Sequence, residues 1–225
     1  MEMIVKTKEF FESELERILN IHFDAKYYFK DVQYLNNPET AEERIAAADN
    51  SIIRRIRVAF WRIGIIEIAK LFQRSKNQHY NLVDYIGDLN QNYLQYTWLA
   101  DLPQAKLNEW LVSINSGSIK SIRDRVCVQR DNYFAHTDKS PSVELTEAQI
   151  SFEEINSLID FTESIMFDIK AYCFKTHSDF EVTGLEKAGD ILMAFASLKE
   201  KRERVHKQEL DEWLKDRDNV GKKTN

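Results

Sequence analysis

The segment from Arg130 to Asp138 is the part of this chain best equipped for chemistry. Within about one and a half helical turns it carries a fixed cation, polar groups and an imidazole, at Arg130, Asp131, Asn132 and His136. Histidine titrates near neutral pH and can take up or give a proton. The planar guanidinium of arginine suits phosphoryl oxygens. A histidine and an arginine would fit metal-free cleavage of RNA. In that reaction the 2′-hydroxyl attacks the phosphorus, and a 2′,3′-cyclic phosphate forms.

Two other interpretations of this segment are open. In the structural one, Arg130 pairs with Asp131 or Asp138, and His136 gains only from the negative end of a helix dipole. Spacing alone favours this structural interpretation. Metal-dependent hydrolysis is a weak third interpretation, because the five histidines are scattered singly and the chain has neither an HExxH motif nor paired cysteine ligands. We therefore expect no metal and no other cofactor.

The spacing of Arg130 and His136 constrains any shared site. Six residues at about 100° each place the two side chains about 120° apart on a straight helix. One copy aims both at a single point only if the helix ends or bends between them. A two-fold dimer could instead bring two copies of the segment together in a composite cleft. We therefore expect a homodimer.

A locally basic surface is expected around this segment, although the chain has a formal net charge of −6. The acidic total argues against broad coating of nucleic acid, because phosphate affinity comes from Lys and Arg. Near the segment, cations outnumber the aspartates; they are Lys120, Arg123, Arg125, Arg130 and Lys139. Arg123 precedes Arg130 by seven residues and so lies on the same side of a helix. We expect Arg123 and Lys139 to contribute to substrate binding.

The elements that must position these residues are helices. With only 6 Gly and 3 Pro, the chain favours long helices over many short strands, and its 43% hydrophobic residues can form a core. Apolar residues recur at helical spacing in seven stretches. These are 7–35, 40–75, 82–98, 103–115, from about 119 into the key segment, 151–176 and 185–218. We expect an all-α bundle of about five to seven helices with a long C-terminal helix.

The helix predicted over residues 40–75 is expected to be the most buried, because it is apolar on nearly every side from Val58 to Phe72. Its polar exceptions, Glu67, Lys70 and Arg74, share one stripe. Spacing alone favours an internally paired, solvated edge. In the functional interpretation, the stripe borders the active cleft, and Lys70 and Arg74 contact the substrate.

Two helix starts carry a capping-box pattern, in which Ser or Thr precedes Glu by three residues. One is Thr40 with Glu43, and the other is Ser151 with Glu154. In each pair, the two side chains are expected to hydrogen-bond each other's backbone N–H groups.

The remaining features predict a cytoplasmic protein without a membrane segment. No run of 18 apolar residues occurs, and the N-terminus lacks a signal-peptide core. Cys127 and Cys173 lie in apolar helical patterns and are expected to be reduced core residues. Residues 1–198 are predicted to form the helical domain. Residues 199–225 would be a charged helical extension that is either solvated or partner-binding.

The segment also resembles a known motif. Arg130-Asp131-Asn132, three further residues and His136 resemble the Arg-polar-x(3–5)-His motif of the HEPN superfamily, all-helical proteins that include many metal-independent RNA nucleases. The extension to Asp138, and the aromatic-rich helix that ends in Glu67-Ile68-Ala69-Lys70-Leu71-Phe72, are similar to its abortive-infection-like branch. The resemblance covers roughly residues 50–175 and implies a HEPN-like bundle.

The resemblance implies roles for four residues. Arg130 would bind the phosphate and His136 would be the catalytic histidine. Asp131 would orient the arginine or polarise the site, and Asn132 would assist with a hydrogen bond. Members of the superfamily commonly dimerise across this motif and act as toxins, phage-defence effectors or RNA-processing enzymes. A toxin would have an antitoxin protein as a further partner.

With the resemblance included, the catalytic interpretation is favoured. We expect a metal-independent endoribonuclease, a toxin or phage-defence effector whose site lies at a homodimer cleft. The alternative is a noncatalytic HEPN-like module that binds RNA, nucleotide or protein.

Overall fold

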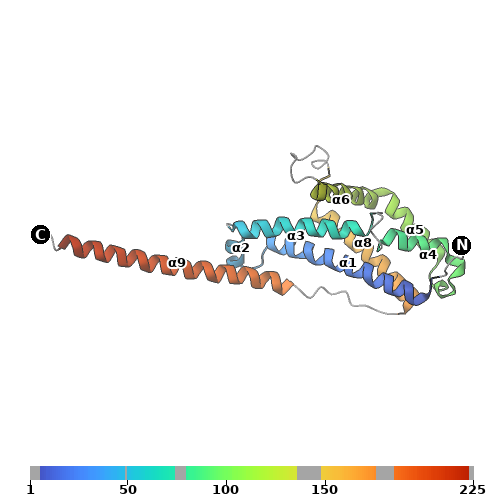
Figure 1. Ribbon diagram of the computed structural model, residues 1–225, viewed down its shortest axis with the longest axis horizontal. Coiled ribbons are helices and arrows are strands. Elements are labelled where there is room, and N and C mark those ends of the chain that lie inside the picture. The colour runs from blue at the N-terminus through green and yellow to red at the C-terminus, as the bar shows by residue number, and fades with distance from the viewer. Residues whose placement is uncertain (1–5, 49, 74–79, 136–147, 176–184, 223–225) are drawn as a thin grey trace. The chain divides into compact units, whose positions relative to one another are not determined.

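The computed structural model describes residues 6–48, 50–73, 80–135, 148–175 and 185–222, with the backbone alone at 133–135, 185–188 and 211–222. These residues form helices and no strand, which confirms the prediction of an all-α fold. The α-helices are α1 (Lys8–Asn36), α2 (Ala41–Ala48), α3 (Ser51–Lys70), α4 (Leu82–Gln91), α5 (Gln104–Asn115), α6 (Gly117–Ala135), α8 (Phe152–Ile169) and α9 (Leu185–Lys222) (Figure 1). Short helical turns η1 (Tyr93–Gln95) and η2 (Thr97–Leu99) follow α4, and a π-helical turn η3 (Lys170–Phe174) follows α8.

The single helix predicted over residues 40–75 is wrong, because these residues form α2 and α3. The side chain of Asn50 accepts a hydrogen bond from the backbone N–H of Ile52 at 2.9 Å. It therefore begins a new helix, as asparagine side chains readily do. This division gives eight α-helices in the described residues, one more than the predicted upper number.

Burial along α3 is uneven, which also corrects the prediction that other helices surround its apolar part from Val58 onward. Val58 is 47% exposed, whereas Ile65 and Ile68 are fully buried. The apolar composition around the whole helix thus predicted burial correctly for the second half of α3 and wrongly at Val58. That half leads to Gln73, which bears on the candidate site.

Both predicted capping boxes are confirmed. At the start of α8, the backbone N–H of Glu154 donates to Ser151 Oγ at 3.2 Å, and that of Ser151 donates to Glu154 Oε2 at 3.0 Å. Before α2, Glu43 and Thr40 exchange the same two bonds at 3.2 and 3.1 Å. The two pairs satisfy N–H groups that a helix start leaves unpaired, so these two starts are fixed locally.

The chain divides into two compact units. Unit 1 comprises Met1–Lys30 and Val58–Val182, and unit 2 comprises Asp31–Arg57 and Thr183–Asn225. The predicted division at residues 198 and 199 falls inside α9. Unit 2 buries Leu35, Ala47 and Ile53 together with Leu192 of α9.

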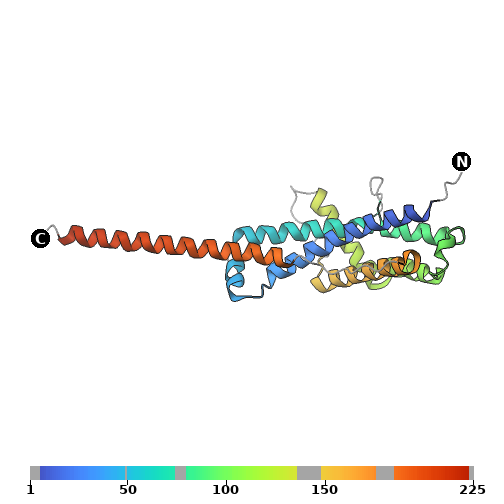
Figure 2. The ribbon, with the colours of Figure 1, turned by 90° about the horizontal axis from the view of Figure 1, so that it is seen from below.

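Helix α8 runs alongside α1 in unit 1 (Figures 1 and 2). It buries one face, formed by Ile155, Leu158, Ile159, Ile165, Met166 and Ile169. Glu163 of α8 accepts from Lys26 Nζ of α1 at 2.5 Å, and Lys170 Nζ donates to Glu16 at 2.6 Å. Apolar packing thus sets the position of α8, and ion pairs along its edges fix its register against α1.

A fully buried histidine also lies between α1 and α8. His22 Nδ1 is 3.0 Å from Thr162 Oγ1, and His22 Nε2 is 3.4 Å from Glu163 Oε2. Burial lowers the pKa of His22, and this outweighs the opposing effect of the nearby Glu163 carboxylate. The fold therefore favours a neutral imidazole at this position.

Candidate functional site

The candidate site begins at the C-terminal end of α6, which carries Arg130, Asp131 and Asn132. Arg130 Nη1 donates to Asp131 Oδ1 at 3.0 Å. The same oxygen accepts from Gln73 Nε2 at 3.3 Å, so the end of α6 lies beside the residues that follow α3. The side chains of Arg130 and Asp131 are 29% and 57% exposed. Asp131 thus links two segments far apart in sequence and holds one side of a guanidinium that reaches solvent.

Asn132 is directed toward its own helix. Its Nδ2 donates to the backbone carbonyl of Val128 at 2.8 Å. This is the back-bonding to the preceding turn that short polar side chains make in helices. This bond competes with the assisting role predicted for Asn132.

Three predicted site residues lie outside the described residues. They are His136, Lys139 and Arg74. Helix α6 is described to Ala135, the residue before His136. The relation between the Arg130 guanidinium and the His136 imidazole therefore stays a prediction.

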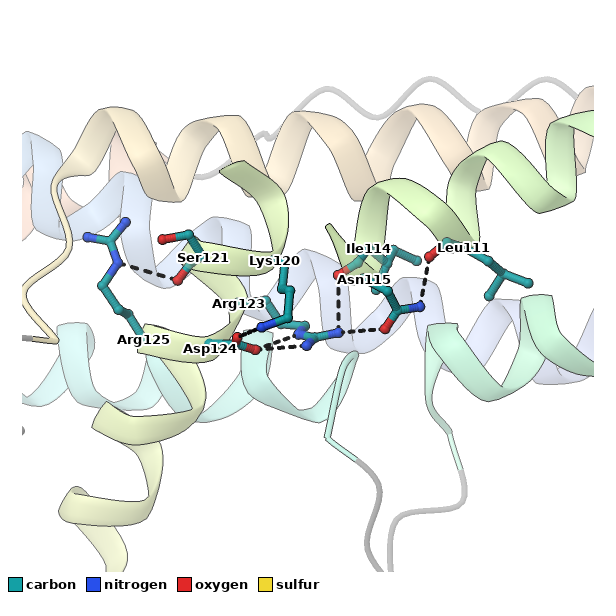
Figure 3. A network of polar contacts seen from close by, with 8 residues as sticks. All are labelled: Leu111, Ile114, Asn115, Lys120, Ser121, Arg123, Asp124 and Arg125. Atoms are coloured by element: carbon teal, nitrogen blue, oxygen red, sulfur yellow. Dashed lines mark hydrogen bonds and ion pairs between the residues drawn. The ribbon is translucent and has the colours of Figure 1, made fainter. Parts of the chain in front are cut away.

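Arg123 holds the junction between α5 and α6. Its Nη1 donates to the carbonyl of Ile114 at 3.1 Å and to Asn115 Oδ1 at 3.2 Å, both at the end of α5. Its Nη2 and Nε donate to Asp124 Oδ1 at 2.8 and 3.1 Å. Figure 3 shows Arg123 between these groups. Its contacts make Arg123 a link between helices, and a role in substrate binding would compete with that link.

Asp124 is shared by two cations. Lys120 Nζ lies 2.5 Å from Asp124 Oδ2, on the opposite carboxylate oxygen from Arg123 (Figure 3). Partial burial alone would raise the pKa of Asp124, but the hydrogen bonds from Lys120 and Arg123 outweigh it and lower the pKa. The carboxylate is thus held in its charged form.

Arg125 fastens α6 to α8. Its Nη2 donates to Glu154 Oε1 at 2.5 Å, and its Nη1 donates to Glu154 Oε2 at 3.0 Å and to the carbonyl of Gln149 at 2.6 Å. The hydrogen bond from Arg125 is the main reason that the pKa of Glu154 is lowered. Glu154 is also the second member of the α8 capping box, so one carboxylate both begins α8 and anchors α6.

The predicted basic excess along α6 is largely balanced. Each described cation of that group lies at a carboxylate; these cations are Lys120, Arg123, Arg125 and Arg130. Ion pairing of this kind lowers the positive potential that would attract RNA. The structure of α6 therefore weakens the expectation of a locally basic surface.

Lys70 is the last residue of α3 and pairs with Glu67, whose carboxylate accepts from Lys70 Nζ at 2.5 and 2.6 Å. This is the internal pairing that the spacing alone favoured. Three residues later, Gln73 reaches Asp131. The structure thus brings the region after Lys70 to the end of α6, while Lys70 itself bonds within its helix.

Sequence reasoning missed the two glutamines that position this region, Gln73 and Gln129. Gln129 is buried, and its Nε2 donates to the carbonyl of Ala148 at 2.6 Å while its Oε1 accepts from Trp61 Nε1 at 3.4 Å. The available signal was a polar residue three positions after Val126, on the buried face of the same helix. Gln73 carried no comparable signal. The sequence placed it in the last turn of a helix predicted to end at residue 75, whereas α3 ends at Lys70.

Metal binding and cysteine nucleophiles are the alternatives to acid–base chemistry near α6. Within the part of the chain that the structure describes, no group of three or more His, Cys, Asp or Glu side chains could hold a metal ion. Cys127 and Cys173 are free thiols. Burial raises the pKa of the Cys127 thiol to about 11, so it is protonated at neutral pH and a poor nucleophile.

Among the described residues, no helix is both long enough and apolar enough to span a membrane. Comparison of the chain with protein-family models, with curated proteins and with solved structures found no match. The resemblance to the HEPN superfamily therefore depends on the motif residues alone.

Proposed function

We propose that the chain is a metal-independent endoribonuclease in which Arg130 binds the scissile phosphate and His136 transfers a proton. The observation that supports this best is the shared acceptor Asp131 Oδ1, which receives hydrogen bonds from Arg130 and from Gln73. A guanidinium oriented before substrate arrives needs less rearrangement to meet developing charge. Arg130 also reaches solvent at the end of its helix, where a phosphate can approach.

In this mechanism the attacking group belongs to the RNA. The 2′-hydroxyl loses its proton to a base and attacks the adjacent phosphorus, and the bond to the 5′-oxygen breaks as that oxygen gains a proton. His136 would exchange one of these protons, because imidazole titrates near neutral pH. Arg130 would stabilise the charge on the phosphoryl oxygens. The products are a 2′,3′-cyclic phosphate and a 5′-hydroxyl.

The proposal includes a homodimer cleft, which the spacing of Arg130 and His136 and the motif resemblance both favour, and a role as a toxin or phage-defence effector, which the resemblance implies. It also includes the cytoplasmic location that the sequence predicts. The balanced charges along α6 bear on the dimer. If each copy supplies Arg130 to one cleft, two copies double that positive charge available to one RNA strand. Substrate affinity would then depend on association of the subunits.

The test is cleavage of mixed-sequence RNA by purified full-length protein in EDTA. We expect wild type to produce 2′,3′-cyclic phosphate ends, and His136→Ala and Arg130→Ala to lose at least about a hundredfold in rate. Two variants on α9, His206→Ala and Arg204→Ala, remove the same residue types at exposed positions and serve as matched controls. If wild type cuts no RNA, or if His136→Ala cuts as fast as His206→Ala, the nuclease proposal is wrong.

The ion pairing along α6 favours a second candidate, a noncatalytic module that binds RNA, nucleotide or protein. Four described cations held at carboxylates suit a stable surface better than a strongly attractive phosphate channel. RNA binding that persists in His136→Ala without cleavage by wild type would support it. A steep loss of affinity with salt would identify phosphate contacts, whereas a flat response would point to a protein partner.

A further inference from the structure

One side of α9 carries a stripe of apolar side chains, formed by Ile191, Phe195, Leu198 and Val205. At about 100° per residue, the four lie within about 80° of one another around the helix. Phe195 is partly buried, whereas Ile191, Leu198 and Val205 are 41%, 53% and 46% exposed. Single exposed apolar residues are ordinary, but a stripe at helical spacing is the pattern of a helix face that packs against another element.

A groove of about 420 Å³ within unit 2 widens the middle of this stripe. Its apolar lining comes from Phe195 and Leu198 of α9, from Ile45 of α2 and from Ile52 of α3. Ile45 and Ile52 are 60% and 50% exposed, although both are large apolar residues. We call the stripe and the groove together the docking face.

The length and surroundings of the docking face suit a helix. From Ile191 to Val205 the stripe extends for about 21 Å at 1.5 Å per residue, which matches about four helical turns and exceeds one small ligand. The described residues contain no strand, so they offer no sheet edge to an extended peptide. An amphipathic helix that lays its apolar side into a groove is the recognition mode that remains.

The charges of the docking face indicate the sign of its occupant. Arg202 belongs to the stripe, within about 60° of both Leu198 and Val205. Lys199 and Arg202 line the groove together with one carboxylate, Glu203, and the groove includes the start of α3, where the helix dipole is positive. An occupant that covers the stripe takes the Arg202 guanidinium out of water, which is costly unless a carboxylate meets it. The matching helix is therefore acidic.

We propose that the docking face binds an amphipathic helix of a partner protein, with a carboxylate opposite Arg202. The same stripe of a second copy offers no carboxylate between Ile191 and Val205. A flat lipid surface does not fill a groove that has walls from α2 and α3. The association is independent of the chemistry proposed at Arg130.

Two designed peptides test the charge preference with the full-length protein. Each is a labelled helix of about 18 residues with the same apolar stripe, and the residues that face Lys199 and Arg202 are Glu in one and Lys in the other. Fluorescence anisotropy should show the acidic peptide bound at least about tenfold more tightly. Arg202→Glu should reverse this preference. Arg204→Glu, the same change on the opposite side of α9, should preserve it.

Three alanine variants test the position of the docking face. Leu198→Ala on α9 and Ile45→Ala on α2 should each weaken binding of the acidic peptide by about tenfold, because both remove apolar anchors of the groove. Leu210→Ala is the matched control: Leu210 is 48% exposed but lies about 120° from Leu198 around the helix. It should leave binding unchanged. Circular dichroism checks that every variant keeps the helix content of wild type.

Several results would overturn the proposal. They are binding of neither peptide, equal binding of both, or equal losses in Leu198→Ala and Leu210→Ala. Dimers of wild type that Leu198→Ala separates in sedimentation would assign the docking face to a second copy. Binding to phosphatidylserine vesicles that Leu198→Ala abolishes, without peptide binding, would assign it to a membrane surface. A wild type that cleaves no RNA would contradict the proposed nuclease and leave the docking face as it is.

Discussion

Charged side chains serve different purposes in α6 and in the second half of α9. The described cations of α6 discussed above each meet a carboxylate of unit 1, and they tie α6 to α5, to α8 and to the residues after α3. In α9 the basic residues gather in 199–207 and the acidic ones in 208–218. Charge in α6 is thus part of the fold, whereas charge in α9 is segregated by sign along the helix. The net charge of −6 indicates neither the ion pairs of α6 nor the separation of charges in α9.

The largest expected contrast between unit 1 and α9 concerns leucine. Leu158→Ala removes a fully buried side chain from α8 and should lower the free energy of unfolding by about 2–5 kcal/mol through lost burial and a residual cavity. Leu210→Ala is the matched change on α9, where the side chain is 48% exposed, and should cost less than about 0.5 kcal/mol in the monomer. Urea titrations at low protein concentration measure both. Equal costs would mean that α9 is packed as tightly as α8.

A second test uses the buried histidine of unit 1. Because burial lowers the pKa of His22, the folded protein keeps it neutral while the unfolded chain binds a proton below about pH 6.5. Stability is therefore complete above that pH and falls as the pH drops toward the lowered pKa, by up to about 1.4 kcal/mol per pH unit. Facing groups include Glu163, Lys26 and Asp160.

Comparison of wild type with His22→Gln isolates this contribution. The loss of stability between pH 6.5 and 5 should be shallower in the variant, even if the variant is less stable at pH 7.5. The pKa of Glu163 is lowered as well: burial would raise it, but bonds from His22 and Lys26 outweigh burial. Protonation of Glu163 therefore acts at more acidic pH. Parallel curves for the two proteins would assign the acid sensitivity to other groups.

A smaller contrast separates the arginines of the two helices. Arg125→Ala removes the two-pronged contact with Glu154 and the bond to the Gln149 carbonyl. Because both partners are partly exposed, solvent screens the pair, and we expect a cost of about 1 kcal/mol. Arg204→Ala removes only the exposed pair with Glu200 and should cost no more than about 0.5 kcal/mol. A double-mutant cycle with Glu154→Ala measures the coupling directly.

Local patterns in the sequence predicted the helices well, whereas contacts between distant segments were not predictable. Ser151 with Glu154 identified the start of α8, because a capping box needs only residues three apart. The break before α3 was missed, although the polar residues Asp49, Asn50 and Ser51 separate the apolar residues on the two sides and Asn50 accepts a hydrogen bond from the new helix. Gln73 meets Asp131 across 58 residues of sequence, and no periodicity encodes such a contact.

In the candidate site, too, local features were predictable from the sequence and contacts between separate helices were not. The residues of the Arg130 to His136 motif could be found from type and spacing, because they lie within seven consecutive residues. The partners of Arg123 could not, since Ile114 and Asn115 become its neighbours only through the sharp junction of α5 and α6. There Gly117 adopts φ +65, a conformation that favours glycine. The ion pairs that balance α6 were likewise set by tertiary packing.

The smallest expected effect concerns Gln73 and bears directly on the proposed nuclease. Gln73→Ala removes one hydrogen bond to Asp131 at a partly exposed position, so stability should change by less than about 0.5 kcal/mol. If Asp131 orients Arg130 for a phosphate, RNA cleavage should still fall by about three- to tenfold, because the guanidinium then loses one constraint. Gln95→Ala, an exposed glutamine that bonds Asn92 at 3.3 Å, is the matched control and should leave cleavage unchanged. A Gln73→Ala protein with the cleavage rate of Gln95→Ala would show that the contact between Gln73 and Asp131 holds the fold only, and Arg130 would then need another source of orientation.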